Sequence, residues 1–166
     1  MIKAATPADA GAITKMAVKL WPEHTTEELK KEFEGIIGGR ESAVFLLVLE
    51  EQLVGFAQCQ LRNDYVEGTG SSPVGYLEGI FIERDFRRKG YARELLAACE
   101  DWAREQGCTE FASDCELGNR DSLAFHLSMG FSEANRIICF VKKMWHKTDR
   151  VQIELHPVRF HMVYQA

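Results

Sequence analysis

The segment Gly79–Ala92 constrains this chain more than any other stretch. It reads as an apolar strand that runs into the basic turn 87–90 (RRKG), and the helix-forming run 91–102 follows at once. The first N–H groups of a helix have no intrahelical partner, and the helix macrodipole adds partial positive charge at that end. Gly90 has no Cβ, so the backbone there can approach a ligand closely. This strand–turn–helix unit therefore predicts an anion-binding site.

The composition fits one soluble domain. A chain of 166 residues can bury roughly 70% of its extended surface. No apolar run approaches the ~20 residues needed to span a bilayer, and the N-terminus lacks the basic and apolar regions of a secretory signal. The net charge of −5, from 20 basic and 25 acidic residues, disfavours nucleic acid and anionic membranes as partners and permits a cationic substrate. We expect a cytoplasmic protein.

The cysteines and histidines give no metal motif. The five cysteines are odd in number and never spaced C-x-x-C, which argues against a disulfide framework and against a structural zinc site. Cys59 and Cys139 lie in strand patterns and Cys99 in a helix pattern, so we expect buried free thiols. The five histidines form no pair such as H-E-x-x-H. We therefore expect no metal.

Hydrophobic periodicity predicts an α/β fold. The expected helices run from Pro7 to about Trp21, from Thr25 or Thr26 to Gly38, and over residues 91–106 and 119–129. The expected strands are 43–49, 53–62, 74–82 and 109–113, with the last strands at Phe131 and 136–142, and residues 64–73 are expected to form a loop. Two early helices, then hairpins, then strand-helix-strand-helix-strand describe a mixed central sheet flanked by helices.

Residues 145–166 do not fit that core and are expected to be a C-terminal extension. Apolar and polar residues alternate over 151–155 and again over 158–164, with Pro157 between them. An added edge hairpin, a subunit-bridging arm and a non-native tail all fit this pattern. The role of the extension stays open.

Three further sequence motifs resemble those of a known protein family. The runs Arg62–Gly68 (RNDYVEG), Ser71–Val74 (SSPV) and Leu77–Ile80 (LEGI) together resemble the bacterial aminoglycoside 6′-N-acetyltransferases of the GNAT superfamily. The spacing R-x-x-G-x-A over 87–92 is similar to the GNAT pyrophosphate loop. The resemblance covers residues 1–144, which it identifies as one GNAT domain.

That resemblance implies the GNAT fold and an activity. The enzyme would transfer the acetyl group of acetyl-CoA to the 6′-amine of aminoglycoside antibiotics, by direct attack in a ternary complex, and so confer resistance. The resemblance also implies a homodimer. Two alternatives stay open, because a fold does not fix a function. One is acetylation of a polyamine, another small amine or a protein amine, and the other is a CoA-binding sensor that has lost transferase activity.

The resemblance implies where acetyl-CoA binds. The residues of the turn and of the first helical positions would hold the pyrophosphate: Arg87, Arg88, Lys89, Gly90, Tyr91 and Ala92. Ile80 and Ile82 would bind the cofactor from the strand, with the backbone N–H of Ile82 directed at the thioester oxygen. Asn119 is similar to the family asparagine that bonds the pantetheine arm, although a plain N-cap explains it equally well.

Glu78, Ile82 and His126 are the expected catalytic residues. Glu78 lies mid-strand between apolar neighbours, where an acid is rare unless paired, and the resemblance makes it the base or the anchor of the reactive ammonium. Ile82 is four residues further along, so regular alternation points both side chains to one face. His126 stands where many GNAT enzymes carry the tyrosine that protonates the leaving thiolate. A structural role is the alternative for this histidine.

The remaining expected site residues would bind the acceptor. Asp64, Glu67 and Asp114 could pair with ammonium groups, and Asp114 has a family counterpart that contacts the drug. A solvated turn is the alternative for the two loop acids. Trp21 and Tyr65 could form apolar walls for sugar rings, although core packing explains them as well.

Overall fold

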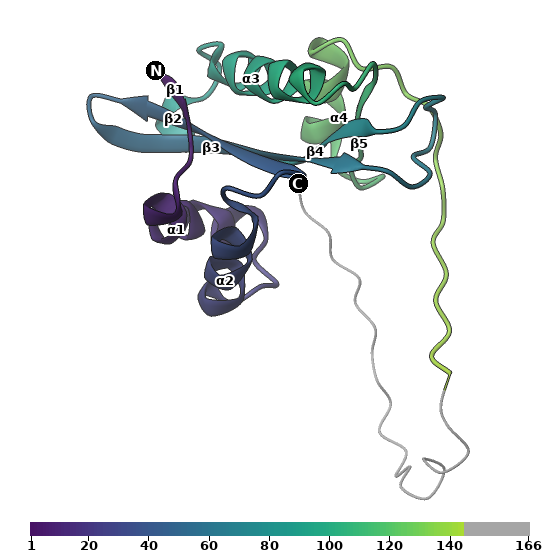
Figure 1. Ribbon diagram of the computed structural model, residues 1–166, viewed down its shortest axis with the longest axis horizontal. Coiled ribbons are helices and arrows are strands. Elements are labelled where there is room, and N and C mark those ends of the chain that lie inside the picture. The colour runs from purple at the N-terminus through teal and green to yellow at the C-terminus, as the bar shows by residue number, and fades with distance from the viewer. Residues whose placement is uncertain (145–166) are drawn as a thin grey trace, which may run out of the picture.

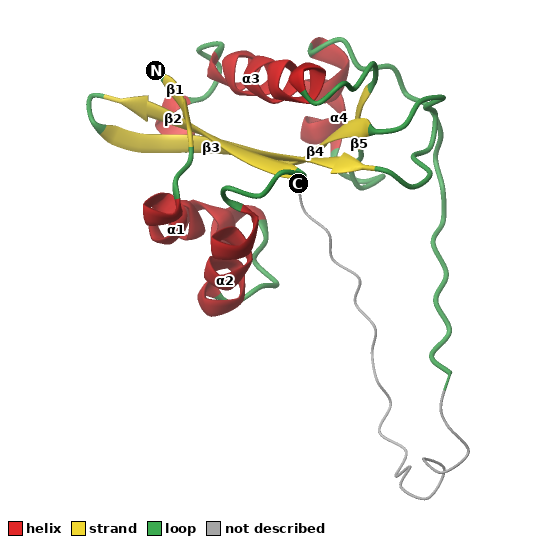
Figure 2. Ribbon diagram, viewed as in Figure 1, coloured by secondary structure: helices red, strands yellow, loops and turns green. Residues whose placement is uncertain are grey.

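In the computed structural model, which describes residues 1–144, one five-stranded sheet lies between two layers of helices. Helices α1 and α2 cover one face, and α3 and α4 lie on the other (Figure 1). The sheet order is β1-β2-β3-β4-β5; the first four strands pair antiparallel and β5 pairs parallel to β4 (Figure 2). The predicted mixed sheet flanked by helices is therefore present. The extension 145–166 lies outside the described residues.

The element bounds follow the predicted ones within one or two residues for most elements. The strands are β1 (Ile2–Ala4), β2 (Ser42–Leu49), β3 (Gln52–Arg62), β4 (Val74–Ile82) and β5 (Phe111–Ser113). The helices are α1 (Ala10–Leu20), α2 (Thr26–Ile36), α3 (Tyr91–Glu105) and α4 (Arg120–Ser128). Strand β1 was not singled out by the residue pattern, because three residues are too few to show alternation.

Two hydrophobic clusters hold the layers together, one on each face of the sheet. The cluster under α1 and α2 contains Ile13, Phe33, Leu46, Phe56 and Phe81 among its buried residues. The cluster under α3 contains Leu47, Ala57, Ile82, Leu95 and Cys99. Consecutive strand residues point to opposite faces, so neighbours such as Phe81 and Ile82 enter different clusters. Both faces of the central strands are buried, which makes β3 and β4 a rigid base.

Strands β4 and β5 separate part of the way along. Their pairing covers only three pairs, of which Leu77↔Ser113 is the last. The Glu83 N–H bonds to the Val54 carbonyl at 2.8 Å, so the alternation of an antiparallel ladder turns the N–H groups of Ile80 and Ile82 away from β3. Those N–H groups face the side on which β5 has ended. Among the described residues, these N–H groups of β4 therefore have no partner strand.

The predictions at Phe131 and 136–142 are wrong, because neither forms a strand. Phe131 packs against the α3 cluster. Residues 132–144 have no secondary structure; Asn135 still bonds to Glu67 at 3.0 Å, and the chain after it runs away from the body of the molecule (Figure 1). A strand needs a neighbour to bond its N–H and C=O groups. Within residues 1–144 no strand lies beside this segment, so its β-forming composition remains unpaired.

The cysteine prediction holds in part. Cys59 and Cys99 are buried free thiols, whereas Cys139 is exposed, contrary to the prediction, because the segment that carries it leaves the core.

Within residues 1–144 no three metal-ligating side chains gather. None of the helices in that range is long and apolar enough to cross a membrane.

Candidate active site

Glu78 lies on a β-bulge in the middle of β4. The register pairs Gln58 with Gly79 and Cys59 with Leu77, which leaves Glu78 as the extra residue. A bulge of this kind breaks the alternation of side chains. Glu78 therefore lies on the face of α1 and α2, whereas Ile82 packs under α3. The prediction that these two side chains share a face is wrong for that reason.

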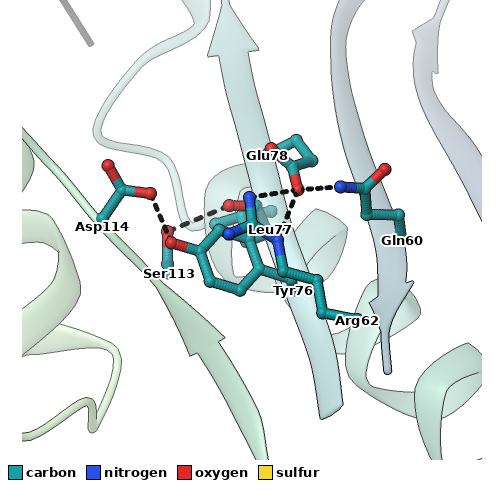
Figure 3. A network of polar contacts seen from close by, with 7 residues as sticks. All are labelled: Gln60, Arg62, Tyr76, Leu77, Glu78, Ser113 and Asp114. Atoms are coloured by element: carbon teal, nitrogen blue, oxygen red, sulfur yellow. Dashed lines mark hydrogen bonds and ion pairs between the residues drawn. The ribbon is translucent and has the colours of Figure 1, made fainter. Parts of the chain in front are cut away.

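Three hydrogen bonds hold the Glu78 carboxylate, and all end on Oε1 (Figure 3). Gln60 Nε2 donates at 2.5 Å, and Arg62 donates through Nη2 at 2.8 Å and through Nε at 3.2 Å. Among the described residues, no donor contacts Oε2. The Glu78 side chain is 22% exposed, so one carboxylate oxygen is fixed by the protein and the other is left for a ligand.

Tyr76 and Asp114 extend this network toward β5. The Arg62 guanidinium lies over the Tyr76 ring, 3.3 Å from its centroid, and the Tyr76 hydroxyl donates to Asp114. Burial, and next the hydrogen bond to Asp114, raise the pKa of Tyr76, so this hydroxyl stays a neutral donor at physiological pH. Asp114 and Glu78 are thus joined through Arg62 and Tyr76, and two carboxylates against one guanidinium suit a cationic ligand.

Gln60, Arg62 and Tyr76 were not predicted as site residues. A signal was available for two of them, since Gln60 and Arg62 are two residues apart on β3 and so share a face. They are polar residues on a strand that is mostly apolar, and they lie next to the predicted Glu78. Tyr76 resembled an ordinary core residue, and it is indeed buried.

Trp21 contacts the site, and the loop residues do not. A Cβ on Gly79 would lie 2.5 Å from Trp21 Cζ2, so the indole lies directly over the residue after Glu78. Tyr65 donates to Glu67 at 2.6 Å and is largely exposed, and Glu67 also accepts from Asn135 at 3.0 Å. Together with the exposed Asp64, these residues make no contact with Glu78 in the described part of the chain.

The predicted anion site has the expected backbone form. Arg87 Nε donates to the Ile82 carbonyl at 2.7 Å, which ties the turn to the end of β4. Arg88 and Gly90 both have positive φ, 61° and 89°, and such turns direct successive N–H groups toward an anion. A Cβ on Gly90 would meet nothing within 4 Å, so the space in front of the first turn of α3 is open.

Asn119 and His126 are held by contacts within the protein. Asn119 is the N-cap of α4, where its side-chain oxygen accepts from the Ser122 N–H at 2.9 Å. His126 Nδ1 lies 2.7 Å from the Ser122 carbonyl, and Nε2 lies 2.9 Å from Ser113 Oγ. The Ser113 hydroxyl in turn donates to the Leu77 carbonyl at 3.0 Å. Ser113 therefore links His126 to the strand that carries Glu78.

This arrangement brings an anion turn, an open length of β4 backbone and an acidic network to one strand. The turn and the opening between β4 and β5 suit an elongated ligand with phosphate groups at one end. The network of polar contacts around Glu78 lies next to that opening, on the side of the sheet that α1 and α2 cover. Its members are Glu78, Gln60, Arg62, Tyr76 and Asp114. A cation bound at Glu78 would lie beside the reactive end of such a ligand, which is the geometry that group transfer requires.

Comparison with known proteins gives one family. Residues 11–131 match the model of the acetyltransferase (GNAT) family. The aminoglycoside N(6′)-acetyltransferase type 1 of Stenotrophomonas maltophilia is 41% identical over 140 residues, which cover 84% of this chain and 90% of that protein.

Solved structures of aminoglycoside 6′-N-acetyltransferases are also similar to this chain. The aminoglycoside 6′-N-acetyltransferase AAC(6′)-IG of Acinetobacter haemolyticus has a TM-score of 0.83 and 35% identity, over 87% of this chain and 99% of that chain. The structure of AAC(6′)-Iy in complex with the bisubstrate analogue CoA-S-monomethyl-acetylneamine gives a TM-score of 0.83 and 34% identity, over 87% of this chain and 98% of that chain.

Proposed function

This chain belongs to the acetyltransferase (GNAT) family, and we propose that it transfers the acetyl group of acetyl-CoA to the 6′-amine of aminoglycoside antibiotics and so confers resistance. The observation that carries the proposal is the Glu78 carboxylate, which is held on Oε1 by Gln60 and Arg62 and has Oε2 unpaired among the described residues. It lies beside the opening between β4 and β5. The Stenotrophomonas maltophilia relative, at 41% identity, carries the same activity in its name.

The chemistry removes two protons from the ammonium, one before the attack and one as the amide forms, and it stabilises one oxyanion. The amine nitrogen attacks the thioester carbonyl carbon, a C–N bond forms and the C–S bond breaks. Glu78 Oε2 orients the ammonium and takes its proton, directly or through a water molecule. The backbone N–H of Ile82, which faces away from β3, donates to the carbonyl oxygen as its negative charge grows. As the C–S bond breaks, the nitrogen releases its second proton to solvent, and the thiolate takes up one proton, from His126 through Ser113 or from solvent.

The acetyl-CoA site uses the turn and the first turn of α3. The N–H groups that follow Gly90 and the cations Arg88 and Lys89 bind the pyrophosphate. The pantetheine arm lies along the β4 backbone opposite Asn119. Residues 1–144 form the whole catalytic domain, and the protein acts in the cytoplasm, where acetyl-CoA is made.

The acceptor binds as a polycation. Glu78 and Asp114 are both carboxylates, and Tyr76 and Arg62 hold them in place. Trp21 gives an apolar wall above Gly79 against which a sugar ring packs. Tyr65, Glu67 and Asp64 reach a larger acceptor from the loop 63–73. A polyamine offers the same ammonium groups without a ring, so it remains the second candidate acceptor.

A matched pair of acceptors tests this function. Neomycin carries a 6′-amine and paromomycin carries a 6′-hydroxyl in the same scaffold. We expect CoA release from acetyl-CoA with neomycin and none with paromomycin, measured with a thiol reagent. Spermidine serves as the third acceptor. Release with spermidine and not with neomycin would replace the drug by a polyamine, and equal release with neomycin and paromomycin would remove the 6′ assignment.

The exposed apolar segment 132–144 supports a homodimer. Ile138, Phe140 and Val141 are 80%, 90% and 94% exposed, and monomeric proteins rarely leave such a patch uncovered. The same segment has the composition of a strand and no partner within residues 1–144. A second copy of the chain covers this segment, because an identical subunit is the partner that is always present.

Charged substitutions in that segment should separate the subunits. We expect the double variant I138E/F140E to elute as a monomer while the native chain has twice the chain mass, because a buried carboxylate in an apolar interface is costly. Light scattering after size-exclusion chromatography measures both masses. Lys142→Glu, on the same exposed segment, is the control and should stay dimeric. A monomeric native chain would overturn the proposal.

A further inference from the structure

Gln58 on β3 is a buried polar side chain whose function the mechanism above does not use. Two polar side chains are buried within residues 1–144, Thr14 and Gln58. Thr14 donates its hydroxyl to the Ala10 carbonyl at 2.8 Å, within its own helix. Gln58 is 6% exposed, and its side-chain oxygen Oε1 has no hydrogen-bond partner in the described structure. A buried acceptor without a partner costs stability, so its presence calls for a reason.

The position of Gln58 in β3 puts it next to the proposed acceptor site. It lies opposite Gly79 in the β3–β4 register, next to the bulge at Glu78. Opposed residues of an antiparallel pair share a face, and a Cβ on Gly79 would contact the Trp21 indole at 2.5 Å. Gln60, two residues along β3, shares that face and holds Glu78 at 2.5 Å. Gln58 therefore lies on the face of the sheet that carries Glu78, opposite the glycine that Trp21 covers.

We propose that Gln58 Oε1 accepts a hydrogen bond from a hydroxyl or ammonium group of the amine-bearing ring of the acceptor, and that Gln58 is a specificity-determining residue. This inference rests on the proposed function. The free protein leaves the oxygen unpaired, and the bound acceptor supplies the donor. A site built around such a group favours ligands that present an N–H or O–H there and rejects analogues that lack one. The neighbouring carboxylates make the same site favourable for cations.

The test replaces Gln58 by methionine, which has a similar length and no hydrogen-bonding amide. We expect the kcat/KM for neomycin to fall about tenfold, the worth of one lost hydrogen bond in a desolvated site, and the KM for acetyl-CoA to stay unchanged. We expect the melting temperature of the free protein not to fall, because the substitution removes an unpaired oxygen. Thr14→Val is the control, since its hydroxyl is paired within its own helix, with the Ala10 carbonyl. It should leave both kinetic constants unchanged.

Two results would overturn the inference. A lower melting temperature for Gln58→Met would mean that the amide has a partner in the free protein. An unchanged kcat/KM for neomycin would mean that the acceptor does not use the oxygen. These failures differ from failure of the proposed function, which is seen in the native chain as the absence of acetyl transfer to any aminoglycoside. The melting temperature is read without an acceptor, so it decides independently of that outcome.

Discussion

Replacing Glu78 by glutamine should lower the kcat/KM for neomycin by about 10²–10⁴-fold, the usual contribution of a general acid or base. The glutamine oxygen can still accept from Gln60 and Arg62, which hold Glu78 Oε1 at 2.5 and 2.8 Å. The shape of the site is therefore kept, and the group that attracts the ammonium and takes its proton is lost. Steady-state CoA release measures the effect, and the KM for acetyl-CoA should stay close to its native value.

Glu83→Gln is the matched control for Glu78→Gln. Glu83 follows β4 directly and forms an ion pair with Lys19 at 2.6 Å on the surface, so it has the same carboxylate chemistry near the same strand and lies outside the site. Surface ion pairs contribute little to stability, and we expect its turnover to match that of the native chain. Native turnover in Glu78→Gln would remove Glu78 from proton transfer and leave it only a role in packing.

The second large effect is expected at Gly90, where Gly90→Val should raise the Kd of acetyl-CoA by about 10- to 100-fold. The φ of Gly90 is 89°, and a β-branched residue there is strained by roughly 1–3 kcal/mol. The open space over Gly90 is also the proposed position of the pyrophosphate, so the side chain would displace the ligand. Isothermal titration with CoA measures the affinity directly.

Gly107→Val separates these two causes. Gly107 closes the other end of α3, with a φ of 88° and nothing within 4 Å of an added Cβ. The backbone strain is therefore equal in the two variants, and only the distance to the turn differs. We expect both variants to lose stability and Gly107→Val to keep its affinity for CoA. An equal loss of affinity in both variants would refute the assignment of the turn as the pyrophosphate site.

The local features of the fold could be predicted from the sequence. Residues that are neighbours in the sequence predict three consecutive elements. An apolar run predicts β4, the basic residues and the glycine predict the turn at 87–90, and the run after it predicts α3. The predicted loop 64–73 lies between β3 and β4, because turn-forming residues fill it. The α/β class followed from the order of these elements.

Features that depend on distant parts of the chain could not be predicted. The register that leaves Glu78 on a bulge is set by pairing with β3, so regular alternation gave the wrong face for Ile82. Residues 136–142 carry a strand composition, but composition does not say whether a partner strand lies beside them. The pairing of β3 with β4 places the Arg62 guanidinium over the Tyr76 ring. The sequence does not show this pairing, so the two residues could not be assigned to the site from it.

The most direct measurement is the position of the acetyl group on the product. Neomycin has six amines, and Glu78 is proposed to orient only one of them toward the thioester. NMR of the purified product should show a single acetamide on the 6′-nitrogen. An acetyl group on any other nitrogen, or a mixture of positions, would contradict the proposed placement of the acceptor against Glu78, Asp114 and Trp21.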